Sequence, residues 1–593
     1  MTFKQLSQYI QKIEKVSSRL QITEILADLF EKLKPEEYEK TVYLLLGRLT
    51  PKYKTLNFGM AEKMVIRSIA SAIQIDPSEF IKKYKQSGDI GETTQEYKKE
   101  QSSMPEATPE IIFVFEVLET IARASGEGSQ DTKISLLSGL IQTLDPLSAR
   151  YVVRIPLGVL RLGFSDMTVI DALSWMYQGD KGIRPEIQKA YHVHPDLGVI
   201  GRKLKESGLE EVMKIEPQLF TPILMMRAER LSSGQEIIEQ IGKCGVEPKF
   251  DGFRLQVHKK GLEVRLYTRG LDDATFMYPD VVEAVRAEIT AQNVIIEGEA
   301  IGYDVQTGNF LPFQETVQRK RKYDIEEKAK EIPLKLFVFE LLYLEGKNFV
   351  SEPFSDRRKA LKSIIDGDNN HAEHGVILAE EQIIDDPAQL EIMFEDAITK
   401  GLEGIVAKKL DGTYQPGARG WNWIKFKRSY SSKIDDTIDC VVMGYDYGKG
   451  KRTQFGIGAF LAGIYDEERG MYLTIAKIGT GLTDDEWRRL QAQGSKLKVQ
   501  MKPKEYDVDK LMDVDVWITP EIVVEVKADE ISRSPVHTAG KKLKQSKSGN
   551  AFEVEVAGFA LRFPRLERFR DDKTPTDATT LKEVGKMFDK QRE

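Results

Sequence analysis

A change in hydrophobic periodicity near residue 237 constrains the fold of this chain more than any other feature. Up to about residue 210, apolar residues recur at helical spacing, as in FKQLSQYIQKIEK and IIFVFEVLETIAR. From Ile237 onward the chain turns to short β-rich runs separated by Gly and Asp, such as LEVRLYTRG and NVIIEGEAIGYD. At 593 residues, the chain is also several times the size of a single hydrophobic core. We therefore expect several domains, of which the first is helical.

Three domains are predicted along the chain. Residues 1–212 are expected to be all-helical, with the polar stretch SGDIGETTQEYKKEQSSMPEATP dividing them into two lobes. Residues 213–430 are expected to form an α+β domain. Residues 431–593 begin with SSKIDD, which we interpret as a hinge, and continue as strands with Gly-rich turns. This pattern favours a small β-barrel followed by a C-terminal tail.

The composition excludes several classes of protein. Two cysteines, Cys244 and Cys440, cannot build a disulfide framework or a four-thiolate zinc site, which favours a reducing compartment. The longest apolar stretch, LKLFVFELLYL, is too short to cross a bilayer, and the N-terminus lacks the apolar segment of a signal peptide. The net charge of −7 means that any polyanion must bind a local basic patch. We expect a cytoplasmic monomer with no membrane contact.

The sequence EPKFDGFR, residues 247–254, contains the strongest candidate for a nucleophile. Asp-Gly after Lys249 predicts a tight turn, so the lysine would project from the mouth of a hairpin. A lysine attacks phosphorus only as the neutral amine, so burial or nearby cations must lower its usual pKa of about 10.4. Arg254 and the later KFK could supply such cations or hold phosphates. An ordinary surface hairpin is the alternative, because K-x-D-G occurs again at Lys409.

The longer pattern K-x-D-G-x-R at Lys249 resembles the nucleotidyl-lysine motif of the covalent nucleotidyltransferases, which include DNA ligases, RNA ligases and messenger RNA capping enzymes. Further motifs of that superfamily follow in order along the whole chain. They are YTRG with Arg269, IIEGEAIGYD with Glu299, FVFELLYLEG with Phe339, LEGIVAKK with Glu403 and Lys408, WIKFKRSY with Lys425 and Lys427, and R-x-D-K with Arg570, Asp572 and Lys573. The resemblance implies that Lys249 is the catalytic residue that carries the nucleotide.

The resemblance also implies how the other residues bind ATP. Glu247 would accept a hydrogen bond from the adenine amino group, and Phe339 would stack on the purine. Arg254 and Arg269 match positions that contact the ribose and the reacting groups. The remaining cations would hold the triphosphate or orient the leaving pyrophosphate, and they are Arg419, Lys425, Lys427, Arg570 and Lys573.

Glu299 and Glu403 are the candidate metal ligands. Glu299 ends one predicted buried strand and Glu403 begins another, and two carboxylates at a phosphate site suit Mg²⁺. Taken alone, each glutamate would more often be an ion-pair partner. The expected cofactors are therefore Mg²⁺ and ATP as co-substrate. No G-K-[S/T] tripeptide occurs, so a P-loop ATP site is excluded.

The helical region, through ASGEGSQDTKISLLSGLI and ARYVVRIPLGVLRLGFSDMTVIDAL, resembles the DNA-binding domain of the larger ATP-dependent DNA ligases of archaeal and eukaryotic type. SGEGSQ could offer backbone N–H groups to a phosphate, and a simple capped loop is the alternative. Arg150, Arg154 and Arg161 favour phosphate binding. HVHP, with His192 and His194, has metal-like spacing, but we expect an ordinary surface segment there.

The predicted fold is therefore multidomain α+β, with an all-helical DNA-binding domain, an α+β nucleotidyltransferase (adenylation) domain and a β-barrel OB-fold domain. The resemblance implies an ATP-dependent DNA ligase that seals nicks in duplex DNA through lysyl-AMP and 5′-adenylated DNA, in replication, repair and recombination. Its expected partner is nicked double-stranded DNA. A sliding clamp is a second candidate partner, although the sequence contains no convincing clamp-binding motif.

Four alternatives to an ATP-dependent DNA ligase are disfavoured by the sequence. The helical domain argues against an RNA ligase and against a capping guanylyltransferase. An NAD-dependent ligase is disfavoured, because its four-cysteine zinc module cannot be built from two cysteines. A catalytically inactive nucleic-acid scaffold would lack the charged residues that this chain retains, which are Lys249, Arg254, Glu299, Glu403, Lys425 and Lys427.

Overall fold

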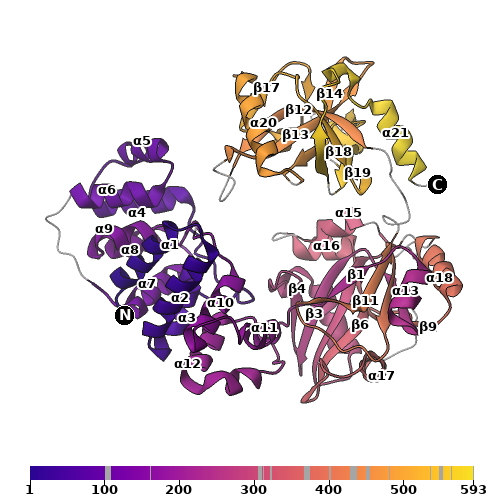
Figure 1. Ribbon diagram of the computed structural model, residues 1–593, viewed down its shortest axis with the longest axis horizontal. Helices are drawn as coiled ribbons and strands as arrows, with labels where there is room; N and C mark the ends of the chain where they lie inside the picture. The colour runs from indigo at the N-terminus through magenta and orange to yellow at the C-terminus, as the bar shows by residue number, and fades with distance from the viewer. Residues whose placement is uncertain are drawn as a thin grey trace. The chain divides into compact units, whose positions relative to one another are not determined.

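The computed structural model divides into two compact units, Met1–Lys427 and Arg428–Glu593 (Figure 1). It describes residues 1–100, 108–160, 162–304, 310–311, 313–320, 324–365, 374–399, 402–427, 437–448, 455–479, 481–534, 536–545, 552–562 and 564–591. The first unit contains both the helical region and the α+β region, and the second contains the C-terminal strands. Arg161 and the predicted hinge at SSKIDD lie outside the described residues.

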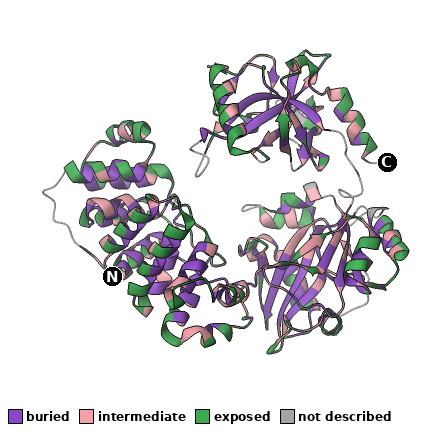
Figure 2. Cartoon of the chain, in the orientation of Figure 1, coloured by how far each residue is buried: buried purple, intermediate pink, exposed green. Residues whose placement is uncertain are grey.

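The first part of the chain is helical, as its periodicity predicts. In α1 the apolar residues at helical spacing are buried, and Thr2 and Gln5 form a capping box at its start. Figure 2 shows the buried residues of this region along the inward faces of its helices, where they form one core. The helices are α1 (Phe3–Glu14), α2 (Arg19–Lys32), α3 (Tyr38–Leu45), α4 (Glu62–Ile73), α5 (Pro77–Ser87), α6 (Ile90–Glu100), α7 (Ile111–Arg123), α8 (Ser129–Thr143), α9 (Pro146–Val152), α10 (Asp166–Gln178), α11 (Arg184–Val193) and α12 (Leu197–Met213).

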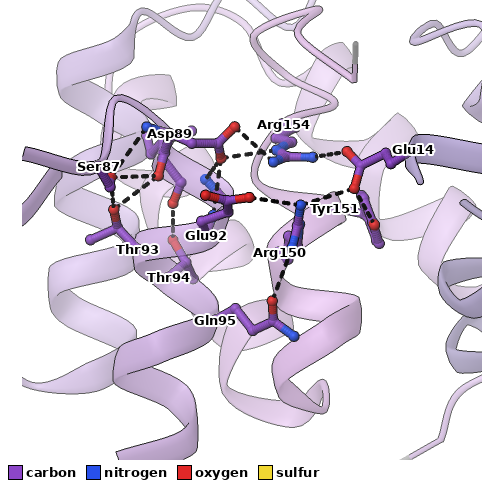
Figure 3. Close-up of polar contacts among 12 residues, drawn as sticks. Glu14, Ser87, Asp89, Glu92, Thr93, Thr94, Gln95, Arg150, Tyr151 and Arg154 are labelled. Carbon is purple, nitrogen blue, oxygen red and sulfur yellow. Dashed lines mark hydrogen bonds and ion pairs between the residues drawn. The ribbon is translucent and has the colours of Figure 1, made fainter. Parts of the chain in front are cut away.

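A network of ion pairs joins α1, α9 and the turn between α5 and α6 (Figure 3). Arg154, with only 2% of its side chain exposed, lies 2.5 Å from Glu14 Oε1 and 2.7 Å from Asp89 Oδ2. Arg150 lies 2.9 Å from Glu14 Oε2 and 3.0 Å from Glu92 Oε1. Carboxylates of the same region thus hold both guanidinium groups, and phosphate binding by Arg150 and Arg154 stays a prediction.

The α+β region contains two sheets. One has the order β1-β11-β10-β2-β9, and the other has the order β4-β3-β5-β6-β7, with β8 beside β6. The strands of the first sheet are β1 (Arg227–Arg230), β2 (Cys244–Lys249), β9 (Gln382–Ile384), β10 (Gly404–Lys409) and β11 (Arg419–Lys427). Those of the second are β3 (Phe253–Lys260), β4 (Glu263–Thr268), β5 (Asn293–Gly302), β6 (Leu334–Leu344), β7 (Lys347–Asn348) and β8 (Val376–Leu378).

Helices cover the outer face of each of these sheets. The core of the first sheet packs against α13 (Gly234–Ile241) and α18 (Pro387–Thr399). The core of the second packs against α14 (Pro279–Glu288) and α17 (Phe354–Lys362). A further apolar cluster, which includes Ile295 of β5, Leu342 of β6 and Trp423 of β11, joins the two sheets through their other faces. The two sheets thus face each other across this cluster, and each contributes polar side chains to the space between them. Two shorter helices, α15 (Phe313–Thr316) and α16 (Ile325–Glu331), precede β6.

The predicted hairpin at Lys249 is wrong. Lys249 ends β2 in the first sheet, whereas β3 begins in the second sheet, so the chain crosses between sheets at residues 250–252. Gly252 permits this crossing, because a Cβ there would lie only 2.3 Å from the carbonyl oxygen of Ala300. The Asp-Gly pair thus marks a change of sheet rather than a return in the same one.

The second unit is rich in strands. Its main sheet has the order β15-β17-β12-β13-β14-β16, with β18 beside β12 and β23 beside β18. These strands are β12 (Ile438–Tyr447), β13 (Ile457–Asp466), β14 (Met471–Ile478), β15 (Lys498–Val499), β16 (Tyr506–Asp507), β17 (Val516–Ile518), β18 (Val523–Lys527) and β23 (Arg565–Phe569). Two separate pairs are β19 (Glu530–Ser534) with β22 (Gly558–Arg562) and β20 (Lys542–Gln545) with β21 (Phe552–Val556). The helices are α20 (Asp484–Lys496) and α21 (Leu581–Lys590).

The predicted closure of this unit into a barrel is not observed. Over the described part of the second unit, β15 and β16 stand at opposite ends of the strand order and do not pair with each other. Each is two residues long and so offers few backbone groups for closure. The structure therefore agrees with a multidomain α+β fold that has a helical region and a C-terminal strand unit. None of the helices in the described ranges has the length and apolar character that a membrane span requires.

We expect Arg154→Met to lower the free energy of unfolding of the helical region by about 3 kcal/mol, because it removes a buried cation that bridges the carboxylates of Glu14 and Asp89, while Glu14 keeps its ion pair with Arg150. Urea-dependent hydrogen exchange of the α6 amides would measure this loss. The matched control is Arg123→Met in α7, whose exposed guanidinium pairs with Glu119 on the same helix. Its expected effect is below about 0.5 kcal/mol, and equal effects of the two changes would contradict a buried network.

Candidate active site

A cavity of about 220 Å³ lies between the two sheets of the α+β region. It brings together most of the residues that the motifs single out. Those in its wall are Glu247, Lys249, Arg254, Arg269, Glu299, Phe339, Arg419 and Lys425. The wall also contains residues to which the motifs assign no specific role, namely Arg227, Ala228, Pro248, Phe250, Val406, Lys408 and Trp423. Arg570 and Lys573 belong to the second compact unit.

Strand register fixes the surroundings of Lys249. Gly404 of β10 lies opposite Lys249 on β2 and opposite Lys427 on β11. The neighbouring Glu403 donates its backbone N–H to the Lys249 carbonyl, at 3.0 Å. Its carboxylate Oε2 lies 2.5 Å from Lys249 Nζ and 4.0 Å from Lys427 Nζ. Lys249 and Glu403 are thus an ion pair at the edge of the cavity, and a quarter of the lysine side chain is exposed.

Gly404 must be glycine for this arrangement. Its φ of +142° is a conformation that other residues rarely adopt, and a Cβ would lie 2.2 Å from the carbonyl oxygen of Phe426. The strand β10 can therefore approach β11 closely just where Glu403 turns toward Lys249.

Glu299 lies opposite Arg254 in the β3–β5 pairing. The pKa of Glu299 is raised to about 7, chiefly by burial and also by the nearby carboxylates of Glu403 and Asp251, while the charges of Lys249 and Arg254 oppose the rise. Glu299 and Glu403 therefore affect each other's charge, as two ligands of one cation would. Within the described residues, no group of three or more His, Cys, Asp or Glu side chains forms a closed metal site. Two carboxylates alone still fit Mg²⁺, which commonly takes its other ligands from phosphates and water.

Glu247 is buried on the floor of the cavity, with 3% of its side chain exposed. Its Oε2 lies 2.7 Å from Lys408 Nζ, and its Oε1 lies 3.2 Å from Arg358 Nη1. Burial raises the pKa of Glu247, and the charges of Lys408 and Arg358 oppose that rise. The sequence offered no signal for Arg358, which comes from α17, more than a hundred residues further along the chain.

Phe339 lies in the wall between these charged groups. The guanidinium of Arg254 lies 5.5 Å from its ring centroid, Lys408 Nζ lies 5.0 Å away, and Trp423 meets the ring edge-on at 6.2 Å. Lys408 also donates a hydrogen bond to the Phe339 carbonyl, at 2.8 Å. The ring is thus held at a fixed place on the cavity wall, and its predicted stacking on a purine stays a prediction.

Glu297 is a fully buried carboxylate that the motif analysis did not identify. It accepts hydrogen bonds from Arg254 Nη2 (2.6 Å), Gln256 Nε2 (3.0 Å) and the Tyr414 hydroxyl (3.0 Å). The alternation in IIEGEAIGYD could have revealed it, because Glu297 and Glu299 lie two residues apart on the same face of β5. Glu297 therefore fixes the orientation of Arg254 toward the cavity.

Residues 220–226, which we call the strap, connect the helical region to β1 across the face of β3. Alternate side chains of β3 bond its backbone: His258 accepts from Phe220 N–H (3.0 Å), Gln256 bonds both backbone groups of Ile223 (2.7 and 3.0 Å), and Arg254 donates to the Met226 carbonyl (2.7 Å). On the helical side, Leu224 N–H donates to the His192 carbonyl at 2.8 Å. HVHP is thus part of this junction, and its half-buried histidines have pKa values lowered chiefly by burial.

The cavity wall carries an excess of positive charge on its β1–β11 side. The pKa of Lys425 is lowered to about 8, chiefly by burial and also by the cations of Arg230, Lys427, Lys249 and Arg419. Burial also lowers the pKa of Arg269, with Arg254, Arg227 and Arg419 contributing. Because these cations repel one another, the site favours a polyanion such as a triphosphate.

The predicted pyrophosphate-binding residues of the second unit share one carboxylate. Arg570 Nη1 lies 3.0 Å from Asp439 Oδ1, and Lys573 Nζ lies 2.6 Å from Asp439 Oδ2. Arg570 also pairs with Asp572 at 2.7 Å, so R, D and K of the R-x-D-K motif belong to one cluster. Asp439, from β12, was not identified from the sequence. The role of Arg570 and Lys573 toward the nucleotide stays a prediction.

We expect Lys425 to titrate near pH 8 in the ligand-free protein, and Arg230→Met to raise its pKa, because one of the cations that disfavour the ammonium is removed. NMR of ¹³C-methylated lysines, with Lys425→Arg used for assignment, would measure both values. Lys409→Met is the control, since Lys409 is half exposed and pairs with Asp411. A pKa close to about 10.4 in the parent protein would contradict the repulsion among these cations.

Comparison with known proteins points to one family. Three family models match the chain in order: "DNA ligase N terminus" at residues 2–174, "ATP dependent DNA ligase domain" at 225–427 and "ATP dependent DNA ligase C terminal region" at 453–573. The solved structure described as Pmar-Lig_PreS3 has a TM-score of 0.53 and 15% identity, covers 95% of this chain and 99% of its own, and therefore shows a likeness of fold.

Two curated relatives extend the match to full length. The "Probable DNA ligase" of Dictyoglomus thermophilum is 46% identical over 594 residues, which cover 100% of this chain and 98% of the relative. The "DNA ligase 2" of Thermofilum pendens is 39% identical over 601 residues, which cover 99% of this chain and 97% of the relative. With models that match most of its length and relatives of this identity, the chain belongs to the family of ATP-dependent DNA ligases.

Proposed function

We propose that this ligase seals nicks in duplex DNA by carrying AMP on Lys249. The observation that carries the proposal is the position of Lys249 Nζ, 2.5 Å from Glu403 Oε2, at the wall of a cavity lined by cations. Glu299 and the strand cations Arg419 and Lys425 line the same cavity. A lysine that can pass its proton to a carboxylate beside a polyanion site is suited to attack a phosphate.

Three chemical steps follow from this arrangement. The neutral amine of Lys249 attacks the α-phosphate of ATP, so a P–N bond forms, the α–β P–O bond breaks and pyrophosphate leaves. The 5′-phosphate at the nick then attacks the same phosphorus, which breaks the P–N bond and gives 5′-adenylated DNA. Finally the 3′-hydroxyl attacks the 5′-phosphate, forms the phosphodiester and releases AMP. Glu403 accepts the proton that Lys249 must lose in the first step.

The other predicted site residues bind and orient the nucleotide. Glu247 accepts from the adenine amino group, Phe339 stacks on the base, and Arg254 and Arg269 hold the ribose and the α-phosphate. Arg419, Lys425 and Lys427 neutralise the triphosphate, and Arg570 and Lys573 orient the pyrophosphate. Glu299 and Glu403 are the residues that would hold Mg²⁺, which when bound would neutralise charge on the phosphates.

The three predicted domains are proposed in the same way. The order of the three family matches supports a DNA-binding domain at 1–212, an adenylation domain at 213–430 and a C-terminal domain at 431–593. The strand content of the second unit supports an OB-fold for the last of these. Nicked double-stranded DNA is the proposed partner, and a nick-sealing enzyme would serve replication, repair and recombination.

We expect the parent protein, incubated with labelled ATP and Mg²⁺, to give an adenylated band that Lys249→Ala abolishes, because no other amine replaces the nucleophile. The matched control is Lys409→Ala, which alters the second K-x-D-G sequence and should leave the band at its parental intensity. Denaturing gel electrophoresis would measure both. A band that persists in Lys249→Ala, or that never forms in the parent, would refute the mechanism.

We further expect sealing of a nicked DNA duplex with ATP, and at least about tenfold slower sealing with GTP, with NAD or of a nicked RNA duplex, since the family match points to ATP and DNA and the predicted adenine contact at Glu247 disfavours guanine. Gel assays of the sealed strand would measure these rates under identical Mg²⁺ and salt concentrations. Preferential sealing of RNA, or preferential labelling by GTP, would favour one of the alternative nucleotidyltransferases.

A further inference from the structure

Arg358 of α17 lies between the nucleotide cavity and a second cavity. On one side its Nη1 lies 3.2 Å from Glu247 Oε1. On the other side its Nε lies 3.4 Å from Glu381 Oε2, and its Nη2 donates to the carbonyl of Ala379. The second cavity, of about 790 Å³, is lined in part by Arg358 and Glu381. The guanidinium is therefore shared between two carboxylates, of which only Glu247 faces the nucleotide site.

Both oxygens of Glu247 are engaged by cations. Lys408 pairs with Oε2 at 2.7 Å and Arg358 with Oε1 at 3.2 Å, while 3% of the Glu247 side chain is exposed. Lys408 does not interact with Glu247 exclusively, because its Nζ also donates a hydrogen bond to the carbonyl of Phe339. Arg358 thus supplies the second of the two charges that hold this carboxylate in a buried place.

The other charged groups around Glu247 do not replace Arg358. Glu381 acts in the opposite sense, since its negative charge adds to the rise in the pKa of Glu247 that burial causes. The neighbouring Arg357 is taken by Glu340, with bonds of 2.8 and 2.9 Å to its two oxygens. Without Arg358, Glu247 would face Lys408 on one side and the charge of Glu381 on the other.

The protonation state of Glu247 decides which base it can bind. An ionised carboxylate only accepts hydrogen bonds, so it pairs with the 6-amino group of a purine and repels a 6-oxo group. A protonated carboxyl can donate, so it would accommodate the 6-oxo group of hypoxanthine or guanine. Discrimination between the two kinds of purine therefore requires that Glu247 stay charged and fixed in orientation.

We propose that Arg358 is a positioning residue that sets base specificity, because it holds Glu247 as an ion-paired acceptor and thereby selects 6-aminopurine over 6-oxopurine nucleotides. This inference rests on the proposed function, in which the base lies against Glu247. Arg358 itself does not line the nucleotide cavity, so it acts through Glu247 rather than on the nucleotide.

The test compares Arg358→Met with the parent protein. The kcat/KM for labelling of Lys249 is measured with ATP and with inosine triphosphate between pH 6 and 8, a range in which the N1–H of the inosine base stays largely protonated. In the parent, the ATP to ITP ratio should be constant with pH, since titration of Glu299 or Lys425 affects both nucleotides alike. In Arg358→Met, the ratio should fall at least about tenfold at pH 7, because more Glu247 is protonated, and should recover as rising pH ionises it.

Two further variants make the result specific. Lys359→Met changes the exposed neighbour of Arg358 in the second cavity and should leave the ratio unchanged. Arg358→Lys keeps the positive charge, but a single ammonium group cannot reproduce the separate contacts of the guanidinium with Glu247, Glu381 and the Ala379 carbonyl. We therefore expect an intermediate ATP to ITP ratio that rises with pH. This variant decides the matter if Arg358→Met does not fold, as judged by circular dichroism.

The possible results distinguish a failure of the role of Arg358 from a failure of the proposed function. A parental ratio at every pH in Arg358→Met, or in Arg358→Lys where the first does not fold, would overturn the role of Arg358. A parent protein that labels Lys249 with neither nucleotide would instead overturn the proposed function. A ratio that falls equally in Lys359→Met would show that the helix, rather than the guanidinium, affects specificity, and would also overturn the proposal.

Discussion

The register of β10 between β2 and β11 is the constraint on which the candidate site depends. Because Gly404 pairs with Lys249 on one side and with Lys427 on the other, the adjacent Glu403 meets ammonium groups from both neighbouring strands. Slipping either strand by one residue would turn its lysine to the opposite face of the sheet. Lys249, the proposed nucleophile, is therefore placed by backbone hydrogen bonds, which are less easily disturbed than the contacts of a long flexible side chain.

Charge is compensated on one side of the cavity and left uncompensated on the other. The floor, near Glu247 and Glu297, is neutralised by internal partners, whereas the β1–β11 side holds cations that repel one another. A ligand with a neutral base at one end and a polyphosphate at the other matches this division. Under the proposed function, this division would orient ATP with its phosphates on the side where charge is least compensated.

Much of the site was predictable because its residues fall on alternating strand positions or at strand ends, and ordered motifs identify such positions. The structure brings Lys249, Arg254, Glu299 and Lys425 to one cavity for that reason. The sequence could not reveal partners that are distant along the chain, such as Arg358, nor that Asp-Gly after Lys249 leads into another sheet. It also could not distinguish an arginine that awaits phosphate from one already paired, as the network around Arg154 demonstrates.

The strap has a consequence for how the chain can change over evolutionary time. Segments between domains usually tolerate insertions and deletions best, since few of their backbone groups are committed. Here the opposite holds, because side chains of β3 bond Phe220, Ile223 and Met226 in turn, and Phe220 adopts a φ of +66° to fit. Adding or removing one residue would shift every one of these bonds and with them Arg254. This junction should therefore be among the least variable in length of all segments of the chain.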